Sequence, residues 1–201
     1  MKRFTMLAAL FLNLAACSAW AAARPDTGSI SGRVSPQGVS VRIIAKLEGT
    51  NHRVPENIKG EVVLDKGGAF TIHNLPPGRY DLLFLPQGAA QQEYMQDLWS
   101  MIDVEADQTT SGINLRMTPT GSPHMVDEVI VQFRPGTDAE VIARVLSELN
   151  CIVKRRPLDL GTGAFYTVDI PDDKTVEEMI QAFQAREEVL SASPNSIYRA
   201  M

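Results

Sequence analysis

Cysteine, histidine and aromatic residues are all scarce in this chain. Its 201 residues include two cysteines, three histidines and an aromatic share of 6%. Cys17 lies in a segment that we expect to be processed, so the mature chain would hold one unmodified thiol, Cys151, and no intramolecular disulfide. Cys151 opens an expected strand, where a small buried apolar role is typical of cysteine.

Sequence patterns of catalysis are also missing. The chain has no Gly-x-Ser-x-Gly motif, no Asp…His…Ser order of catalytic segments, no phosphate loop and no dinucleotide fingerprint. His52, His73 and His124 are isolated in expected loops or at a strand end, as solvated side chains are. The acid pairs Asp172-Asp173 and Glu187-Glu188 flank expected helices. We therefore expect no catalytic residue, no metal and no cofactor.

Positive charge is in the minority, with 19 lysines and arginines against 24 acids and a formal net charge of -5. The basic residues form no stripe and are not interleaved with aromatic residues. Nucleic acid is therefore not an expected partner.

One long apolar run is present, and it lies at the start of the chain. Residues 1–23 have a short basic beginning, an apolar stretch and then small residues, which is the layout of an export signal and too short for an ordinary membrane span. Ala19-Trp20-Ala21 or Ala21-Ala22-Ala23 fits the small-x-small site of ordinary signal cleavage. Residues 14–17 instead resemble a bacterial lipobox, which would make Cys17 a lipidated N-terminus and a membrane anchor. Both alternatives predict an exported protein, periplasmic or extracellular.

Residues 27–117 show strands and turns throughout. Short alternating segments at 29–34, 39–43, 61–64, 69–73, 80–85, 101–105 and 113–117 predict a β-sandwich of about seven strands. Asp65-Lys66-Gly67-Gly68 is typical of a hairpin turn because glycine tolerates positive φ. The pair Phe70 and Ile72 would share one face of its strand.

This half resembles the carboxypeptidase regulatory-like domains, which have a prealbumin-like sandwich fold. The resemblance is carried by Gly32-Arg33-Val34, Val39-Ser40-Val41 and above all by residues 68–82. It implies a fold and little chemistry, since such modules serve as spacers, adhesion units or carbohydrate binders. Trp99 and Tyr94, near Gln91 and Gln92, could stack on a sugar. The alternative is that Trp99 closes one end of the sandwich.

Residues 118–125 are expected to be a linker, because small polar residues and two prolines give reach and some stiffness. Residues 126–201 then alternate between strand and helix patterns. Strands are predicted at 129–134, 151–156, 164–170 and 189–192, with a loop at 157–163. Thr137 is expected to cap the first helix, which ends near Asn150, and Thr175 with Glu178 forms a capping box for the second.

This order predicts a ferredoxin-like βαββαβ fold, an α+β arrangement in which two helices cover one face of a four-stranded antiparallel sheet. The opposite face must meet solvent or a partner.

Residues 126–201 resemble the propeptides of subtilisin-like serine proteases, a family that also includes free-standing inhibitors. The resemblance is carried by residues 129–136, by Val168-Asp169-Ile170-Pro171 with residues 175–178, and by residues 189–195. It implies that the open sheet face packs on two surface helices of a protease while the C-terminal tail lies in the substrate cleft. Edge-strand pairing would supply affinity and alternate side chains would supply specificity.

The tail residues take their expected roles from this resemblance. Met201 would occupy the primary specificity pocket and Tyr198 a second apolar pocket, with Arg199 and Ala200 between them and Ile197 on the rim. Ser193 and Asn195 stand where some propeptides carry acids. They could still accept hydrogen bonds from protease helices, at about 1 kcal/mol each.

The sequence therefore predicts an exported, non-catalytic protein that inhibits or chaperones a subtilisin-like serine protease in trans. Two alternatives stay open. One is a cell-surface interaction or carbohydrate-binding module, and the other is a truncated protease precursor.

Overall fold

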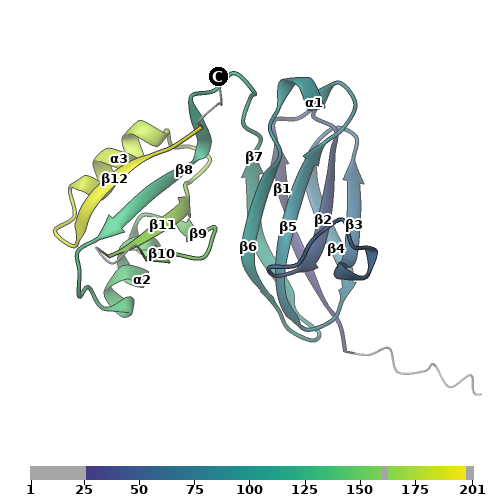
Figure 1. Cartoon of the computed structure of the whole chain (residues 1–201), viewed down its shortest axis with the longest axis horizontal. Helices are drawn as coiled ribbons and strands as arrows, with labels where there is room; N and C mark the ends of the chain where they lie inside the picture. Colours follow the sequence, from purple (N-terminus) through teal and green to yellow (C-terminus); the bar gives the residue numbers. More distant parts are fainter. Residues whose placement is uncertain (1–25, 160–162, 198–201) are drawn as a thin grey trace, which may run out of the picture.

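The computed structural model describes residues 26–159 and 163–197. Figure 1 shows two halves side by side: an N-terminal half that contains β1 to β7, and a C-terminal half that contains β8 to β12 with α2 and α3. In the described residues, each half has its own cluster of buried apolar side chains. No helix of the described residues has the length and apolar character that a membrane crossing requires.

The N-terminal half consists of two sheets that enclose one core. One sheet has the order β4-β1-β7 and the other the order β3-β2-β5-β6. Short helices η1 (Pro55–Asn57) and α1 (Ala90–Glu93) lie in two of the connections. The strands are β1 (Gly28–Ser35), β2 (Val41–Leu47), β3 (Ile58–Leu64), β4 (Gly68–Leu75), β5 (Gly78–Pro86), β6 (Asp97–Val104) and β7 (Thr109–Arg116).

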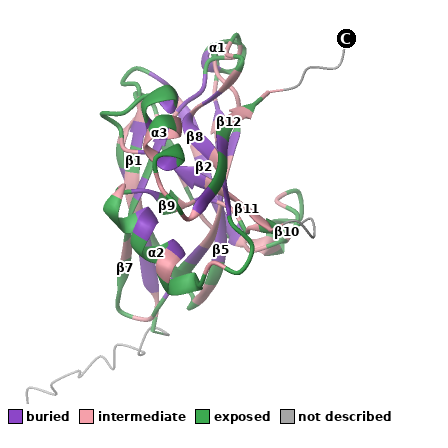
Figure 2. Ribbon diagram, turned by 90° about the vertical axis from the view of Figure 1, so that its left-hand side faces the viewer, coloured by how far each residue is buried: buried purple, intermediate pink, exposed green. Residues whose placement is uncertain are grey.

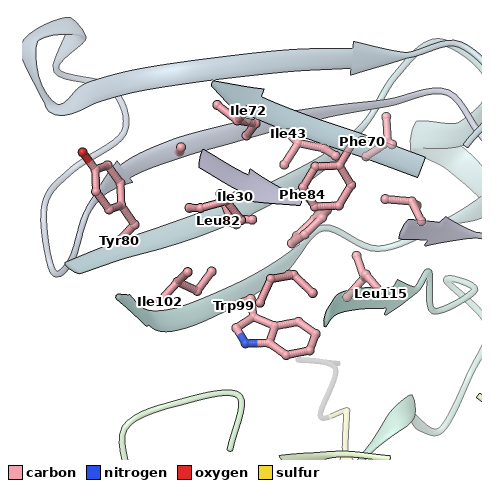
Figure 3. Packing of buried hydrophobic residues seen from close by; sticks show 14 of the residues in the cluster. Ile30, Ile43, Phe70, Ile72, Tyr80, Leu82, Phe84, Trp99, Ile102 and Leu115 are labelled. Atoms are coloured by element: carbon pink, nitrogen blue, oxygen red, sulfur yellow. The ribbon is translucent and has the colours of Figure 1, made fainter. Parts of the chain in front are cut away.

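The core between these sheets is apolar and tightly enclosed. Phe70 and Ile72 are both buried, so their expected placement on one inward face is confirmed. Trp99 lies with Ile102 and Leu115 in the same packed cluster (Figure 3). Such alternation of inward apolar and outward polar side chains explains why these segments form half-buried strands.

The turn before β4 differs from the expected hairpin. Gly67 and Gly68 do adopt positive φ, at 65° and 96°. However, β3 pairs with β2 and β4 pairs with β1, so the turn carries the chain from one sheet to the other. A Cβ at Gly67 would lie 2.8 Å from the Pro36 carbonyl oxygen, so this crossing also requires glycine.

The expected linker, residues 118–125, is shorter in the structure, because His124 and Met125 already belong to strand β8 (His124–Phe133), and its first residues are held against the N-terminal half. Thr118 is buried, its carbonyl accepts from the Met95 N–H at 2.9 Å, and its hydroxyl accepts from the Val126 N–H at 3.2 Å. Pro119 forms a bridge with Tyr94. The reach expected from this composition is therefore reduced, because Thr118 and Pro119 are bonded to the N-terminal half and the Thr118 hydroxyl is bonded to the start of β8.

The C-terminal half is an antiparallel sheet with two helices. The strand order is β10-β11-β8-β12, and β9 also pairs with β11. Helices α2 and α3 cover one face and bury their inner sides, while their outer sides are exposed (Figure 2). The elements are β8 (His124–Phe133), α2 (Ala139–Glu148), β9 (Ile152–Val153), β10 (Leu158–Asp159), β11 (Ala164–Asp169), α3 (Val176–Gln184) and β12 (Val189–Ser196).

The helix ends test three local expectations. The capping box of Thr175 and Glu178 is present in full, and Asn150 adopts φ 53° just after α2, so both expectations are confirmed. The expected cap at Thr137 is wrong. Asp138 is the N-cap of α2, and the Thr137 hydroxyl donates to the Arg134 carbonyl at 2.8 Å because it closes the preceding turn.

The segment 151–159 also departs from expectation. Only Ile152 and Val153 form β9, and a further short strand, β10, lies within the expected loop. The physical reason is that Lys154 is bonded to both halves: its N–H donates to the Thr167 carbonyl of its own sheet, and its carbonyl accepts from the Ser100 N–H of the N-terminal half.

Candidate functional site

The sheet face opposite the helices is the first part of the candidate site. Strand register places Ile130, Phe165 and Ser191 on this face, away from the core that contains Val129 and Val131. Leu158 pairs with Phe165, so it lies on the same side, and it is 59% exposed. Away from the N-terminal half, this face therefore offers a mixed apolar and hydroxyl surface that α2 and α3 do not cover.

The other end of this face packs against the edge of the N-terminal half. Strand β6 is the last strand of its sheet, and its pairing with β5 is interrupted by a bulge where Met101 has φ 63°. At this bulge the Ser100 N–H donates to the Lys154 carbonyl at 2.9 Å, while the Lys154 N–H donates to the Thr167 carbonyl of β11 at 2.9 Å. One residue thus links the sheets of both halves, and it protects an open strand edge.

The Lys154 ammonium lies in a nest of carboxylates from both halves. Its Nζ is 2.8 Å from Asp97, 3.2 Å from Asp127 and 2.8 Å from Glu128. The side chain has no exposed surface, and Nζ also lies 5.4 Å from the centre of the Trp99 ring. One oxygen from each of the three acids lies within 4.8 Å of the others, which is an arrangement suited to a cation, and the ammonium supplies that charge.

Arg155 completes this group of charged residues, which we call the junction; its other members are Lys154, Asp97, Asp127 and Glu128. Its guanidinium binds both Glu128 oxygens at 2.9 Å and reaches Asp97 at 2.8 Å, and its Nε donates to the Leu98 carbonyl at 3.2 Å. Bidentate contacts of this kind fix geometry as well as charge. The two halves are therefore joined by directional, largely buried contacts.

Burial and charge shift the titration of these groups in different directions. Burial raises the pKa of Asp127 to about 6, although Lys154 acts against it. Burial also raises the pKa of Asp169 to about 8, and its Oδ1 has no hydrogen-bond partner in the described chain. For Glu128, burial acts the same way, but Lys154 and Arg155 outweigh it, so its pKa is lowered. The carboxylates likewise outweigh the effect of burial on Lys154 and raise its pKa.

The chain end emerges beside this junction. Asn195 donates its side-chain amide to Glu128, and the Ile197 N–H donates to the Pro123 carbonyl at 2.9 Å. Strand β12 is thus held by β8 as far as Ser196, Ile197 is held by Pro123, and β12 is itself an edge strand. The side-chain nitrogen of Asn195 already donates to Glu128. The side-chain oxygen is therefore the atom of this amide that can accept a hydrogen bond from a partner.

The expected site residues fall into three groups. Asn195 and Ile197 lie at the start of the tail, while Cys17 and Tyr198, Arg199, Ala200 and Met201 lie outside the described residues. The sugar-stacking role of Trp99 is wrong, because its ring is 1% exposed within the core and beside Lys154. Tyr94 packs half-buried against that core. Cys151 is buried, as expected, and burial raises the pKa of its thiol to about 12.

The junction itself was not anticipated from the sequence. Its signal was the presence of charges inside apolar strand patterns, with Glu128 next to Val129 and Lys154 next to Val153. Charged residues at such positions are rarely buried unless paired. Their partner Asp97 lies in a different half, and a single sequence does not reveal that pairing.

A comparison with known families gives a match over the C-terminal part. Residues 114–195 match the family described as the fervidolysin N-terminal prodomain. The match begins within β7 and ends at Asn195, and it confirms the resemblance of this part to the propeptides of subtilisin-like proteases. Neither the curated proteins nor the solved structures gave a match.

Proposed function

We propose that this protein is exported and that its C-terminal half inhibits, or assists the folding of, a subtilisin-like serine protease. The family match of residues 114–195 is the observation that carries the proposal. Propeptide-like domains of subtilisin-like proteases act on the protease rather than on a substrate of their own. On this basis the protein itself would not be an enzyme.

The geometry of the sheet supports a particular binding mode. The helices leave one face free at its Phe165 and Ser191 end, and β12 is an edge strand that leads directly into the tail. In the proposed complex this face would pack on protease helices and the tail would extend as a strand into the cleft. The proposal applies to a protease supplied as a separate chain and equally to one joined to this chain.

In that mode the tail side chains would supply much of the affinity. Tyr198 and Met201 would each fill an apolar pocket, and burying such a side chain contributes about 1.5 to 3 kcal/mol. Loss of both therefore corresponds to a loss of about 3 kcal/mol or more, or about a hundredfold in the inhibition constant.

The test is a titration of active subtilisin-like proteases with the full chain and with a variant that lacks residues 198–201. We expect inhibition by the full chain and an inhibition constant raised about a hundredfold or more in the variant. A variant with residues 198–201 in scrambled order controls for tail length. An absence of inhibition across several such proteases, with no gain in their refolding yield, would refute the proposal, and equal inhibition without the tail would refute the binding mode.

A further inference from the structure

A groove lies between the two halves at the point where the tail begins. It has a volume of about 410 Å³. Its walls include Leu83, Gln96 and Leu98 from the N-terminal half and Met125, Asn195 and Ile197 from the C-terminal half. Gln96 is exposed and directly precedes β6, at the α1 end of the N-terminal half.

We propose that the α1 end of the N-terminal half, with Gln96 and Leu98 at its edge, is a second contact surface for the same protease. This inference rests on the proposed function, because it takes the tail to occupy the substrate cleft. It assigns a role in binding to the N-terminal half, most of which lies outside the family match because that match begins at residue 114.

The short length of the tail is the first argument. Extended chain rises about 3.3 Å per residue, so residues 198–201 span at most about 13 Å from Ile197. An ordinary protein interface covers about 800 Å² on each partner, which corresponds to a patch with a radius of about 16 Å. A protease that holds Met201 in its primary pocket therefore extends over the groove beside Ile197.

The rigidity of the junction is the second argument. The N-terminal half could avoid the protease only by swinging away from the C-terminal half. That movement would separate Asp97 from both Lys154 and Arg155 and would break the hydrogen bond from the Ser100 N–H to the Lys154 carbonyl. The N-terminal half therefore stays at the edge of the tail when a protease approaches.

The chemistry of the groove indicates what fits there. Leu98, Met125 and Ile197 provide apolar surface, and Gln96 provides an amide that can both donate and accept. The charge of Arg155 is already met by Glu128 and Asp97, so the groove offers no free cation to an acidic segment. A largely neutral protease loop beside the cleft, with an apolar side chain at its tip, is the occupant that matches.

The experiment compares two identical substitutions in the full chain. Gln96→Arg places a charge and extra bulk in the groove, while Gln108→Arg makes the same change in the β6–β7 connection at the opposite end of this half. We expect Gln96→Arg to raise the inhibition constant tenfold or more and Gln108→Arg to change it less than twofold. Unchanged Trp99 fluorescence would show that both variants are folded.

A second measurement does not depend on affinity. A photoreactive amino acid placed at position 96 should crosslink to the bound protease, and the same group at position 108 should not. Unchanged inhibition by Gln96→Arg, or equal crosslinking at both positions, overturns this proposal while leaving the proposed function intact. An absence of inhibition by the unmodified chain refutes the proposed function and this inference with it.

Discussion

Replacement of Lys154 by methionine tests whether the buried charges hold the two halves together. Methionine keeps much of the side-chain length and apolar stem but removes the ammonium from Asp97, Asp127 and Glu128, which lie 2.8, 3.2 and 2.8 Å away. Removing one partner of a buried ion pair typically costs about 3 to 5 kcal/mol, because the remaining charge is left uncompensated. We expect Lys154→Met to lower the free energy of unfolding by about this amount at pH 8.

The loss should be smaller at pH 5. Burial raises the pKa of Asp127 to about 6, so this carboxyl is largely protonated at pH 5. A neutral carboxyl is stabilised less by the Lys154 ammonium than a charged one, so removal of the ammonium costs less. Urea unfolding followed by fluorescence is a direct assay, since Trp99 is the one tryptophan that remains once residues 1–23, which contain Trp20, are removed. Lys174→Met is the matched control because Lys174 is half-exposed, and its effect should stay within about 0.5 kcal/mol. A loss below about 1 kcal/mol at both pH values would refute this account of the junction.

Three further expectations concern other positions. Because burial raises the pKa of Asp169 to about 8, the folded state keeps this proton where the unfolded state has lost it. Asp169 therefore contributes stability at low pH that is lost as pH rises from about 4 to about 8. Urea unfolding at several pH values should show the free energy of unfolding of Asp169→Asn rising relative to that of the unsubstituted protein over this range. A difference that stays constant with pH would contradict the assignment. Thr175→Ala should lower the free energy of unfolding by about 1 kcal/mol through loss of the capping box, and by more than Thr137→Ala, whose hydroxyl caps no helix; urea unfolding that gives the reverse order would refute this. The Cys151 thiol, buried and with its pKa raised to about 12, should react with a thiol reagent at pH 8 only in denaturant, and rapid labelling of the folded protein would contradict its burial.

Local patterns in the sequence predict much of the secondary structure. Alternation placed Phe70 and Ile72 on a buried face, and the spacing of Thr175 and Glu178 predicted a capping box that the structure contains. These features depend on residues a few positions apart. They are therefore visible in one chain.

Features that depend on distant residues were not predictable in this way. The turn at Gly67 has the local conformation that glycine favours, but the choice between hairpin and sheet crossing depends on what β1 and β2 pair with. The sequence around Trp99 is compatible with a sugar-binding role, but in the folded protein its ring packs beside Lys154. Asp97 and Asp127, two of the three partners of Lys154, are 57 and 27 residues away, so these ion pairs can be recognised only in the folded protein.

Amide hydrogen exchange of the full chain, with and without a subtilisin-like protease, tests the central claim most directly. If the open sheet face and the tail bind the protease, exchange should slow in β12 and β10, at the free edges of the sheet, and stay unchanged on the outer sides of α2 and α3. Protection over α2 and α3 with none in β12 would contradict the account.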